Sequence, residues 1–178
     1  MPDNTSDNTT DDTTDDTTDD IVANLAQAGN DDSDWNREFD PRSDARERAL
    51  NILFEADLRA VDPKEVVARM QVTIDNLTDL LVVGAAEHRT RIDELISSHS
   101  HAWTIERMAT TDRNVLRLAT YELIDRSEIP TAVIINEAVE LAKRYGTDDS
   151  GRFVNGLLSA IARTTREGGA PTPAPIRD

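Results

Sequence analysis

In every periodic segment between Arg42 and Arg166, apolar residues recur at intervals of three and four, the spacing of amphipathic helices. The clearest example is the set Ala45, Ala49, Ile52, Leu53 and Ala56. Aromatic residues make up only 4 % of the chain, so its core must be built from Ala, Leu, Ile and Val, which favours helices over a strand-rich sandwich. The pattern predicts an all-α fold and nearly excludes an all-β one.

Cap and turn residues divide the first part of this region into three expected helices: one that follows Asp40 and Pro41, one over 62–70, and one over 76–98. The second has an N-cap, a first-turn proline and a capping-box acid in Asp62, Pro63 and Glu65. Asn76 is the expected cap of the third.

The last third of the region predicts three more helices. Thr111 is the expected cap of a helix that runs to Arg126, and Pro130 opens the next. This second helix should turn Ile134, Ala138, Leu141 and Tyr145 inward and end at Gly146 in a left-handed conformation. The last helix should begin at Thr147, Asp148 or Asp149 and bear Phe153, Val154, Leu157, Leu158 and Ile161. With a short helical turn near 104–108, about six to seven helices are expected.

The composition changes sharply at both ends of the helical region. Residues 1–40 hold 13 acidic residues and one base, Arg37, and within this stretch Asp3 to Asp20 is a Thr/Asp repeat without apolar residues. Residues 168–178 are rich in Gly and Pro. We therefore expect a disordered acidic tail over 1–41, a folded domain over 42–167 and a disordered tail over 168–178.

The sequence lacks the signals that are typical of several classes of protein. The chain has no cysteine, and no apolar run approaches the roughly 20 residues that cross a bilayer. Its acidic N-terminus does not resemble a signal peptide, so we expect a cytoplasmic protein. His88, His99 and His101 follow no metal-ligand pattern, and no phosphate-binding glycine loop or nucleophile motif occurs. We expect no metal, no cofactor and no catalysis.

Arginines gather on the first expected helix. Arg42 and Arg46, four residues apart, would share a face that is able to meet a phosphate backbone, with Arg48 and Arg59 nearby. Taken alone, such a face is more often simply solvated.

Three stretches carry a family resemblance: ARERALNILFEADLR at 45–59, VLRLATYELIDRSEIPTAVIINEAVELAKRYGTDDSGRFVNGLLSAIA at 115–162, and within it DDSGRFVNG at 148–156. They resemble the bacterial transcription antitermination factors of the NusB family over about 42–162. The resemblance implies two packed three-helix bundles. It also implies binding of single-stranded boxA RNA in ribosomal RNA leader transcripts together with ribosomal protein NusE, so that RNA polymerase reads through terminators.

The resemblance also implies which residues meet RNA: Arg42, Arg46, Arg48, Phe54, Asp149, Arg152 and Phe153. The arginines would hold phosphates, and Phe54 or Phe153 would offer a face to an unstacked base. Two alternatives remain open, because Asp149 is also suited to cap the last helix and Phe153 lies on its apolar stripe.

One departure bears on function. The family's first helix often follows a dense run of Arg and Lys, but here the corresponding residues are Pro41, Arg42, Ser43 and Asp44. Fewer phosphate contacts imply weaker binding and a shallower salt dependence. The alternative function is a protein-binding helical adaptor, or a homodimer, with a weakened RNA surface.

The acidic tail leads to the first testable prediction. Its 13 acids lie directly upstream of Arg42 and are expected to compete with phosphates for the arginines of the first helix. Removing the tail should therefore tighten RNA binding most at low salt. The gain in affinity should shrink as the salt concentration rises, because 0.1 M salt screens charges that are more than about 10 Å apart. Equal affinities of full-length and truncated protein at low salt, measured by gel-shift titration, would contradict this role.

Overall fold

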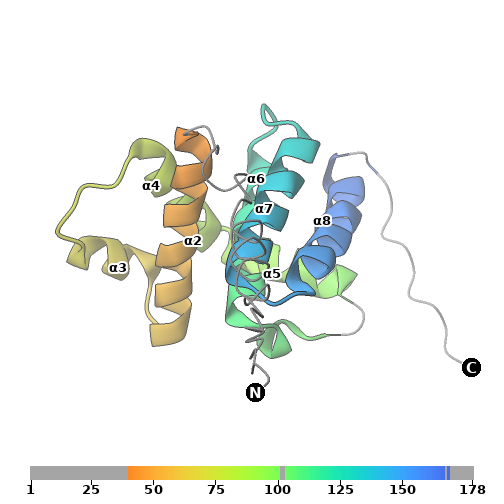
Figure 1. The fold of residues 1–178 in the computed structure, drawn as a ribbon, viewed down its shortest axis with the longest axis horizontal. Coiled ribbons are helices and arrows are strands. Elements are labelled where there is room, and N and C mark those ends of the chain that lie inside the picture. The colour runs from red at the N-terminus through yellow and green to blue at the C-terminus, as the bar shows by residue number, and fades with distance from the viewer. Residues whose placement is uncertain (1–39, 101–102, 167, 169–178) are drawn as a thin grey trace, which may run out of the picture. The chain divides into compact units, whose positions relative to one another are not determined.

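The computed structural model describes residues 40–100, 103–166 and 168, and every regular element in these residues is helical (Figure 1). In order, they are α2 (Pro41–Arg59), α3 (Pro63–Arg69), α4 (Asn76–Glu87), α5 (Arg89–His99), the 3-10 turn η1 (Ile105–Arg107), α6 (Thr110–Asp125), α7 (Thr131–Tyr145) and α8 (Ser150–Arg166). The prediction of an all-α fold with about six to seven helices is confirmed.

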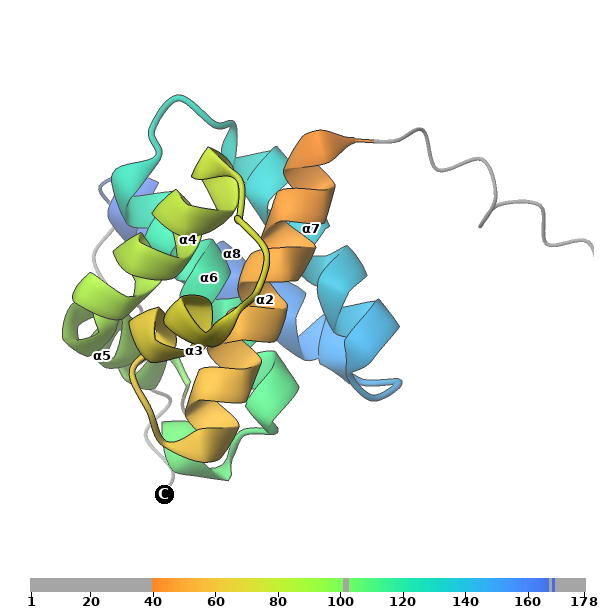
Figure 2. The ribbon, with the colours of Figure 1, turned by 90° about the vertical axis from the view of Figure 1, so that its left-hand side faces the viewer.

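The helices form two groups that pack across one another (Figures 1 and 2). In the first group α2 packs against α3 and α4, and in the second α6, α7 and α8 pack against each other. α2 and α4 also contact α6, while α5 lies against α6 and α8. The implied arrangement of two packed bundles is confirmed, with α5 as an additional helix of the second.

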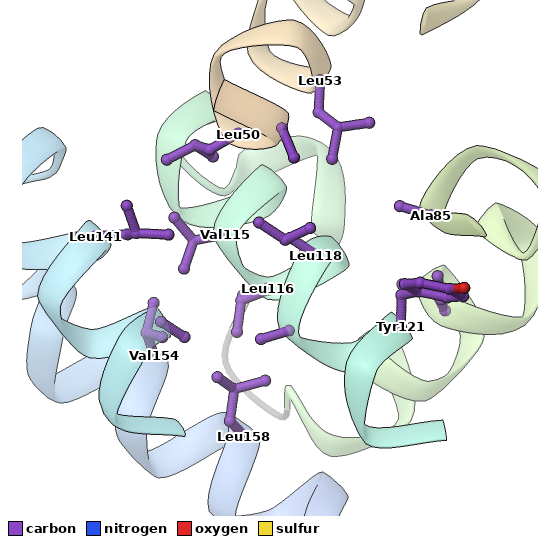
Figure 3. Packing of buried hydrophobic residues seen from close by; sticks show 14 of the residues in the cluster. Leu50, Leu53, Ala85, Val115, Leu116, Leu118, Tyr121, Leu141, Val154 and Leu158 are labelled. Atoms are coloured by element: carbon purple, nitrogen blue, oxygen red, sulfur yellow. The ribbon is translucent and has the colours of Figure 1, made fainter. Parts of the chain in front are cut away.

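The core is centred on α6. Eleven of its 16 residues are buried, and Leu116 and Leu118 are among the largest fully buried side chains. Figure 3 shows how apolar side chains from four other helices surround them: Leu50 and Leu53 of α2, Ala85 of α4, Leu141 of α7, and Val154 and Leu158 of α8. Because α6 touches both groups of helices, it fixes how one lies on the other.

Aspartates cap the first three helices of the described region. The side chain of Asp40 accepts a hydrogen bond from the backbone N–H of Arg42, Asp62 does the same for Lys64, and Asp75 accepts from the N–H groups of Leu77 and Thr78. Asn76 is therefore the first helical residue rather than the cap. Asp40 caps α2 and Pro41 is its first residue, so α2 begins before the boundary that was expected after residue 41, and a deletion of the tail should stop at residue 39. The rest of both expected tails lies outside the described residues, except for Gly168.

Two other expected boundaries are wrong. α6 begins at Thr110, and Ala109 takes the cap position without a side-chain bond, so Thr111 is already helical. The helix expected over 76–98 is broken at His88, which leaves helical geometry (φ −96°, ψ 10°). The His88 ring contacts the Gly84 carbonyl oxygen at 2.9 Å and lies beside Tyr121, its ring centroid 5.8 Å away. This one-residue break lets α4 pack on α2 while α5 packs on α8, and a periodicity of three and four does not reveal it.

The end of α7 also differs from expectation. Ile134, Ala138 and Leu141 are buried as predicted, but Tyr145 is 40 % exposed and donates its hydroxyl hydrogen bond to Glu47. Gly146 is extended (φ −99°, ψ −155°) rather than left-handed. A glycine is needed there because a Cβ atom would lie 2.4 Å from Ser150 Oγ and 2.6 Å from the carbonyl oxygen of Ala142.

Among the described residues, no helix is long and apolar enough to span a membrane.

Two glycines make a matched test of the packing. A Cβ atom on Gly84 would lie 2.0 Å from Tyr121 Cζ, whereas one on Gly156 would meet nothing within 4 Å. Gly84→Ala should therefore destabilise the fold by about 1–3 kcal/mol through overpacking. Gly156→Ala should stabilise it by up to about 1 kcal/mol, because alanine is the better helix former. Urea unfolding of both variants measures this, and equal effects would contradict the packing of α4 on α6.

Candidate nucleic-acid interface

The seven residues expected to meet RNA lie in two places. Arg42, Arg46, Arg48 and Phe54 are on α2, and Asp149, Arg152 and Phe153 are at the start of α8. The end of α7 connects the two places, since Glu47 of α2 pairs with Arg144 Nη1 at 2.7 Å and accepts from the Tyr145 hydroxyl. The turn between α7 and α8 is thereby held near the middle of α2.

Arg46 is an interior residue. Its side chain is 4 % exposed, and its Nε and Nη2 donate to Glu122 Oε2 and Oε1 at 2.9 and 2.8 Å. Glu137 lies 3.8 Å from Nη1. Burial disfavours the charged form of Arg46, but the two glutamates outweigh it and the pKa of Arg46 lies above its ordinary value. The expectation that Arg46 shares an exposed face with Arg42 is wrong, because its guanidinium points inward at carboxylates of α6 and α7.

The other two arginines of the set on α2 are exposed. Arg42 lies in the first turn of α2, beside the Asp40 cap. Arg48 is 46 % exposed and turned towards α4, where its Nη2 lies 2.7 Å from Asp75 Oδ2. Exposed pairs of this kind contribute at most about 1 kcal/mol, so Arg48 remains free to exchange partners.

Phe54 is half-buried on another side of α2. Six residues separate it from Arg48, which places the two about 120° apart around the helix axis. Phe54 instead shares a face with Glu47, seven residues earlier, and thus with the contact to the end of α7. The structure therefore brings Phe54 to the α7 side of α2 and Arg48 to the α4 side.

At the start of α8, Asp149 is in the cap position. Its backbone carbonyl accepts from the N–H of Phe153 at 3.0 Å, while its carboxylate pairs with Arg152 at 3.4 Å. Both side chains of this pair are more than 80 % exposed. Phe153 is half-buried and packs against the core, in agreement with its place on the apolar stripe.

A second set of charges, which is partly buried, was not expected from the sequence. Asp57 of α2 accepts from Arg113 at 2.6 Å, Asn114 at 3.1 Å and Arg117 at 3.2 Å, all on α6. Arg117 also holds Asp93 of α5, with Nε–Oδ1 at 2.8 Å. Burial raises the pKa of the Asp57 carboxyl, but the bonds from Arg113 and the charge of Arg117 outweigh it and bring the pKa below its usual range. The sequence offers one indication of this cluster: Asp57 and Arg117 stand next to apolar residues that are buried in their helices.

Arg166, the last residue of α8, holds the end of α6. Its guanidinium donates to the backbone carbonyls of Glu122, Leu123, Arg126 and Ile129 at 2.7–3.0 Å. The last carbonyls of a helix lack partners within it, and a cation there also favours the helix dipole. No local pattern in the sequence marks this role.

The described histidines make contacts within the fold. His88 Nδ1 contacts the Gly84 carbonyl, and His99 contacts the Leu95 carbonyl and the Thr164 hydroxyl. Within the described ranges, no group of three or more His, Cys, Asp or Glu is placed to hold a metal ion. His101 lies outside these ranges.

The Arg46–Glu122 pair makes a testable prediction about stability. Arg46→Ala should destabilise the protein by about 3–5 kcal/mol, because Glu122 is left buried without its partner. Replacing both residues, Arg46→Met with Glu122→Leu, should recover most of the loss. Arg42→Ala is the matched control and should change the free energy of unfolding by less than about 0.5 kcal/mol. A melting temperature of Arg46→Ala equal to that of Arg42→Ala would refute the interior role.

Known proteins share this fold and much of this sequence. A model of the NusB family matches residues 43–163. A transcription antitermination protein NusB from Acidothermus cellulolyticus is 48 % identical over 124 residues, which cover 67 % of this chain and 86 % of that protein. One from Salinispora tropica is 50 % identical over 128 residues, covering 68 % of this chain and 94 % of that protein.

Solved structures agree. A NusB structure from T. maritima has a TM-score of 0.66 and 38 % identity, covering 74 % of this chain and 97 % of that one. A crystal structure of antitermination factors NusB and NusE in complex with dsRNA has a TM-score of 0.60 and 34 % identity, covering 69 % of this chain and 96 % of that one. The family model alone spans nearly all of the helical domain from α2 to α8, and this chain belongs to the NusB family.

Proposed function

We propose that this protein is an RNA-binding transcription antitermination factor. It binds the single-stranded boxA element of nascent ribosomal RNA leader transcripts together with ribosomal protein NusE, and within the RNA polymerase antitermination complex it helps the polymerase read through terminators. This activity places it in the cytoplasm and needs neither catalysis nor a cofactor.

The observation that carries the proposal is the extent of the match to named relatives. The proteins from A. cellulolyticus and S. tropica are both described as transcription antitermination proteins, and the identities of 48 % and 50 % extend over most of their length. A structural neighbour holds NusB with NusE and double-stranded RNA. Single-stranded boxA as the target follows from the family resemblance of the sequence.

The surface proposed to meet RNA follows the side chains that are accessible. Arg42 and Arg152 offer guanidinium groups to phosphates, Arg48 can leave Asp75 to do so, and the half-buried rings of Phe54 and Phe153 offer edges or faces to bases. Asp149 directly precedes α8, and its carboxylate pairs with Arg152. Arg46 contributes indirectly, because its bond to Glu122 holds α2 in place.

The competing proposal is a protein-binding adaptor or homodimer with a weakened RNA surface. It is favoured by the sparse basic residues at the start of α2, where Arg42 stands between Pro41 and Ser43. The two proposals differ in what the accessible arginines do, so the same variants decide between them.

The function can be tested with two exposed arginines. Arg42→Ala and Arg152→Ala should each weaken binding of leader RNA, and each should reduce the slope of log K against log salt concentration by about 0.7, the value for one phosphate contact of a single strand. Gel-shift titrations at several salt concentrations, with and without NusE, measure both effects. Binding of both variants with the parent's affinity and slope would support the adaptor instead.

A matched control is Arg69→Ala. Arg69 is also exposed and paired with an acid, Glu65, but it lies on α3, at the opposite side of the fold from α8 (Figure 1). This variant removes the same charge and should leave the salt slope unchanged. A reduction as large as that of Arg152→Ala would show a general charge effect rather than a specific surface.

A further inference from the structure

A cavity of about 440 Å³ opens where the end of α2 and the start of α3 meet α6 and the junction of α4 with α5. Aliphatic side chains form one part of its wall: Leu53 and Ala56 of α2, Val61 of the following loop, and Ala85 and Ala86 of α4. Among the described residues, no aromatic side chain lines it. Its volume lies within the roughly 300–1,000 Å³ of small-ligand pockets, and its small apolar side chains leave room for a flexible aliphatic ligand.

The rest of the wall is polar, and most of its side chains are fully engaged. Asp57 accepts from Asn114 and Arg117, which line the cavity with it. Arg117 also donates its Nε and Nη2 to Asp93, at 2.8 and 3.0 Å. These groups therefore give the cavity a fixed polar end but have few donors left for a ligand.

Arg89 is the exception at this polar end. Its side chain is 50 % exposed, and both of its ion pairs are long, with Nη2–Oδ1 of Asp57 at 3.5 Å and Nε–Oδ2 of Asp93 at 3.7 Å. Exposed pairs of this kind contribute at most about 1 kcal/mol. Arg89 is therefore able to turn towards an anion that enters the cavity.

The charge at the polar end also favours an anion. Three arginines meet two aspartates there: Arg89, Arg113 and Arg117 against Asp57 and Asp93. One negative charge on a ligand balances this excess, and a carboxylate matches the fork of a guanidinium. A phosphate group brings a second negative charge, which is disfavoured because the carboxylates of Asp57 and Asp62 both line the cavity.

We propose that this cavity binds a small organic monocarboxylate with an aliphatic chain, its carboxylate on Arg89 and its chain among the alanines. Burial of the chain supplies most of the affinity, and Arg89 selects for the charge. The arginines proposed to meet RNA, Arg42, Arg48 and Arg152, do not line this cavity. The site is therefore separate from the RNA surface and does not rest on the proposed function.

Matched ligands test the two parts of the site on the full chain. The probes are acetate, hexanoate, octanoate and octanol, all below the concentrations at which they form micelles. Octanoate should bind about tenfold or more tightly than hexanoate, because each buried methylene contributes about fourfold in affinity. Acetate lacks the chain and octanol lacks the charge, so each should bind about tenfold or more weakly than octanoate. Calorimetric titration measures the affinities, and the backbone amide signals of Ala85 and Ala86 should shift with octanoate.

Arg89→Ala tests the head-group contact. This variant should lower the affinity for octanoate to that for octanol and leave the affinity for octanol unchanged, which a general loss of structure would not do. The matched control is Arg91→Ala, which removes an exposed arginine from the same helix that does not line the cavity, and it should keep the parent's affinity for octanoate.

Ala86→Leu tests the space itself. Ala86 is half-buried, and the larger side chain should occupy the cavity and weaken binding of octanoate and octanol alike. Thermal melting of each variant separates folding from binding, and the comparison of ligands in the parent needs no variant.

Several outcomes would overturn the site. They are binding of acetate or octanol as tight as that of octanoate, shifts that spare Ala85 and Ala86, equal octanoate affinities of Arg89→Ala and Arg91→Ala, or full affinity in a folded Ala86→Leu variant. None of them bears on the antitermination proposal, which is tested separately by binding of leader RNA.

Discussion

Two ionic contacts between α2 and α6, one buried and one partly buried, determine how this domain is assembled. Arg46 pairs with Glu122, and Asp57, eleven residues later on α2, accepts from Arg113, Asn114 and Arg117. Removing charges from water is costly, so such groups are tolerated only when their partners are in register. The contacts therefore fix the position of α2 along α6 more narrowly than apolar side chains alone, which accept small shifts.

The same contacts explain why the stretches that resemble the family do not consist only of residues for RNA binding. The stretch 45–59 and the stretch that begins at 115 carry much of the resemblance, and they supply both ends of the Arg46–Glu122 and Asp57–Arg117 contacts. Arg46 thus has a structural reason to be arginine. The candidate interface is left with fewer cations, in Arg42, Arg48 and Arg152.

Contacts from several helices hold α8 and the turn before it in place. The end of α7 is fastened to Glu47 of α2, and Ser150 Oγ accepts from the backbone N–H of Thr147 at 2.8 Å. At the far end of α8, Arg166 binds the last carbonyls of α6. With α8 held at both ends, Arg152 is presented to solvent while Phe153 packs against the core.

The sequence by itself determined the all-α class, most helices, the buried stripe of α8 and the family, because apolar spacing and local motifs carry that information along the chain. Tertiary structure alone decided that Arg46 is buried while Arg42 is exposed, that Tyr145 turns outward, and that the helix expected over 76–98 breaks at His88. Each of these depends on a partner distant in sequence: Glu122 for Arg46, Glu47 for Tyr145, and Tyr121 for His88. The charge or polarity of a residue does not reveal whether such a partner will lie near it in the fold. An arginine that has an interior carboxylate partner forms an internal ion pair, whereas one without such a partner is available to bind phosphate.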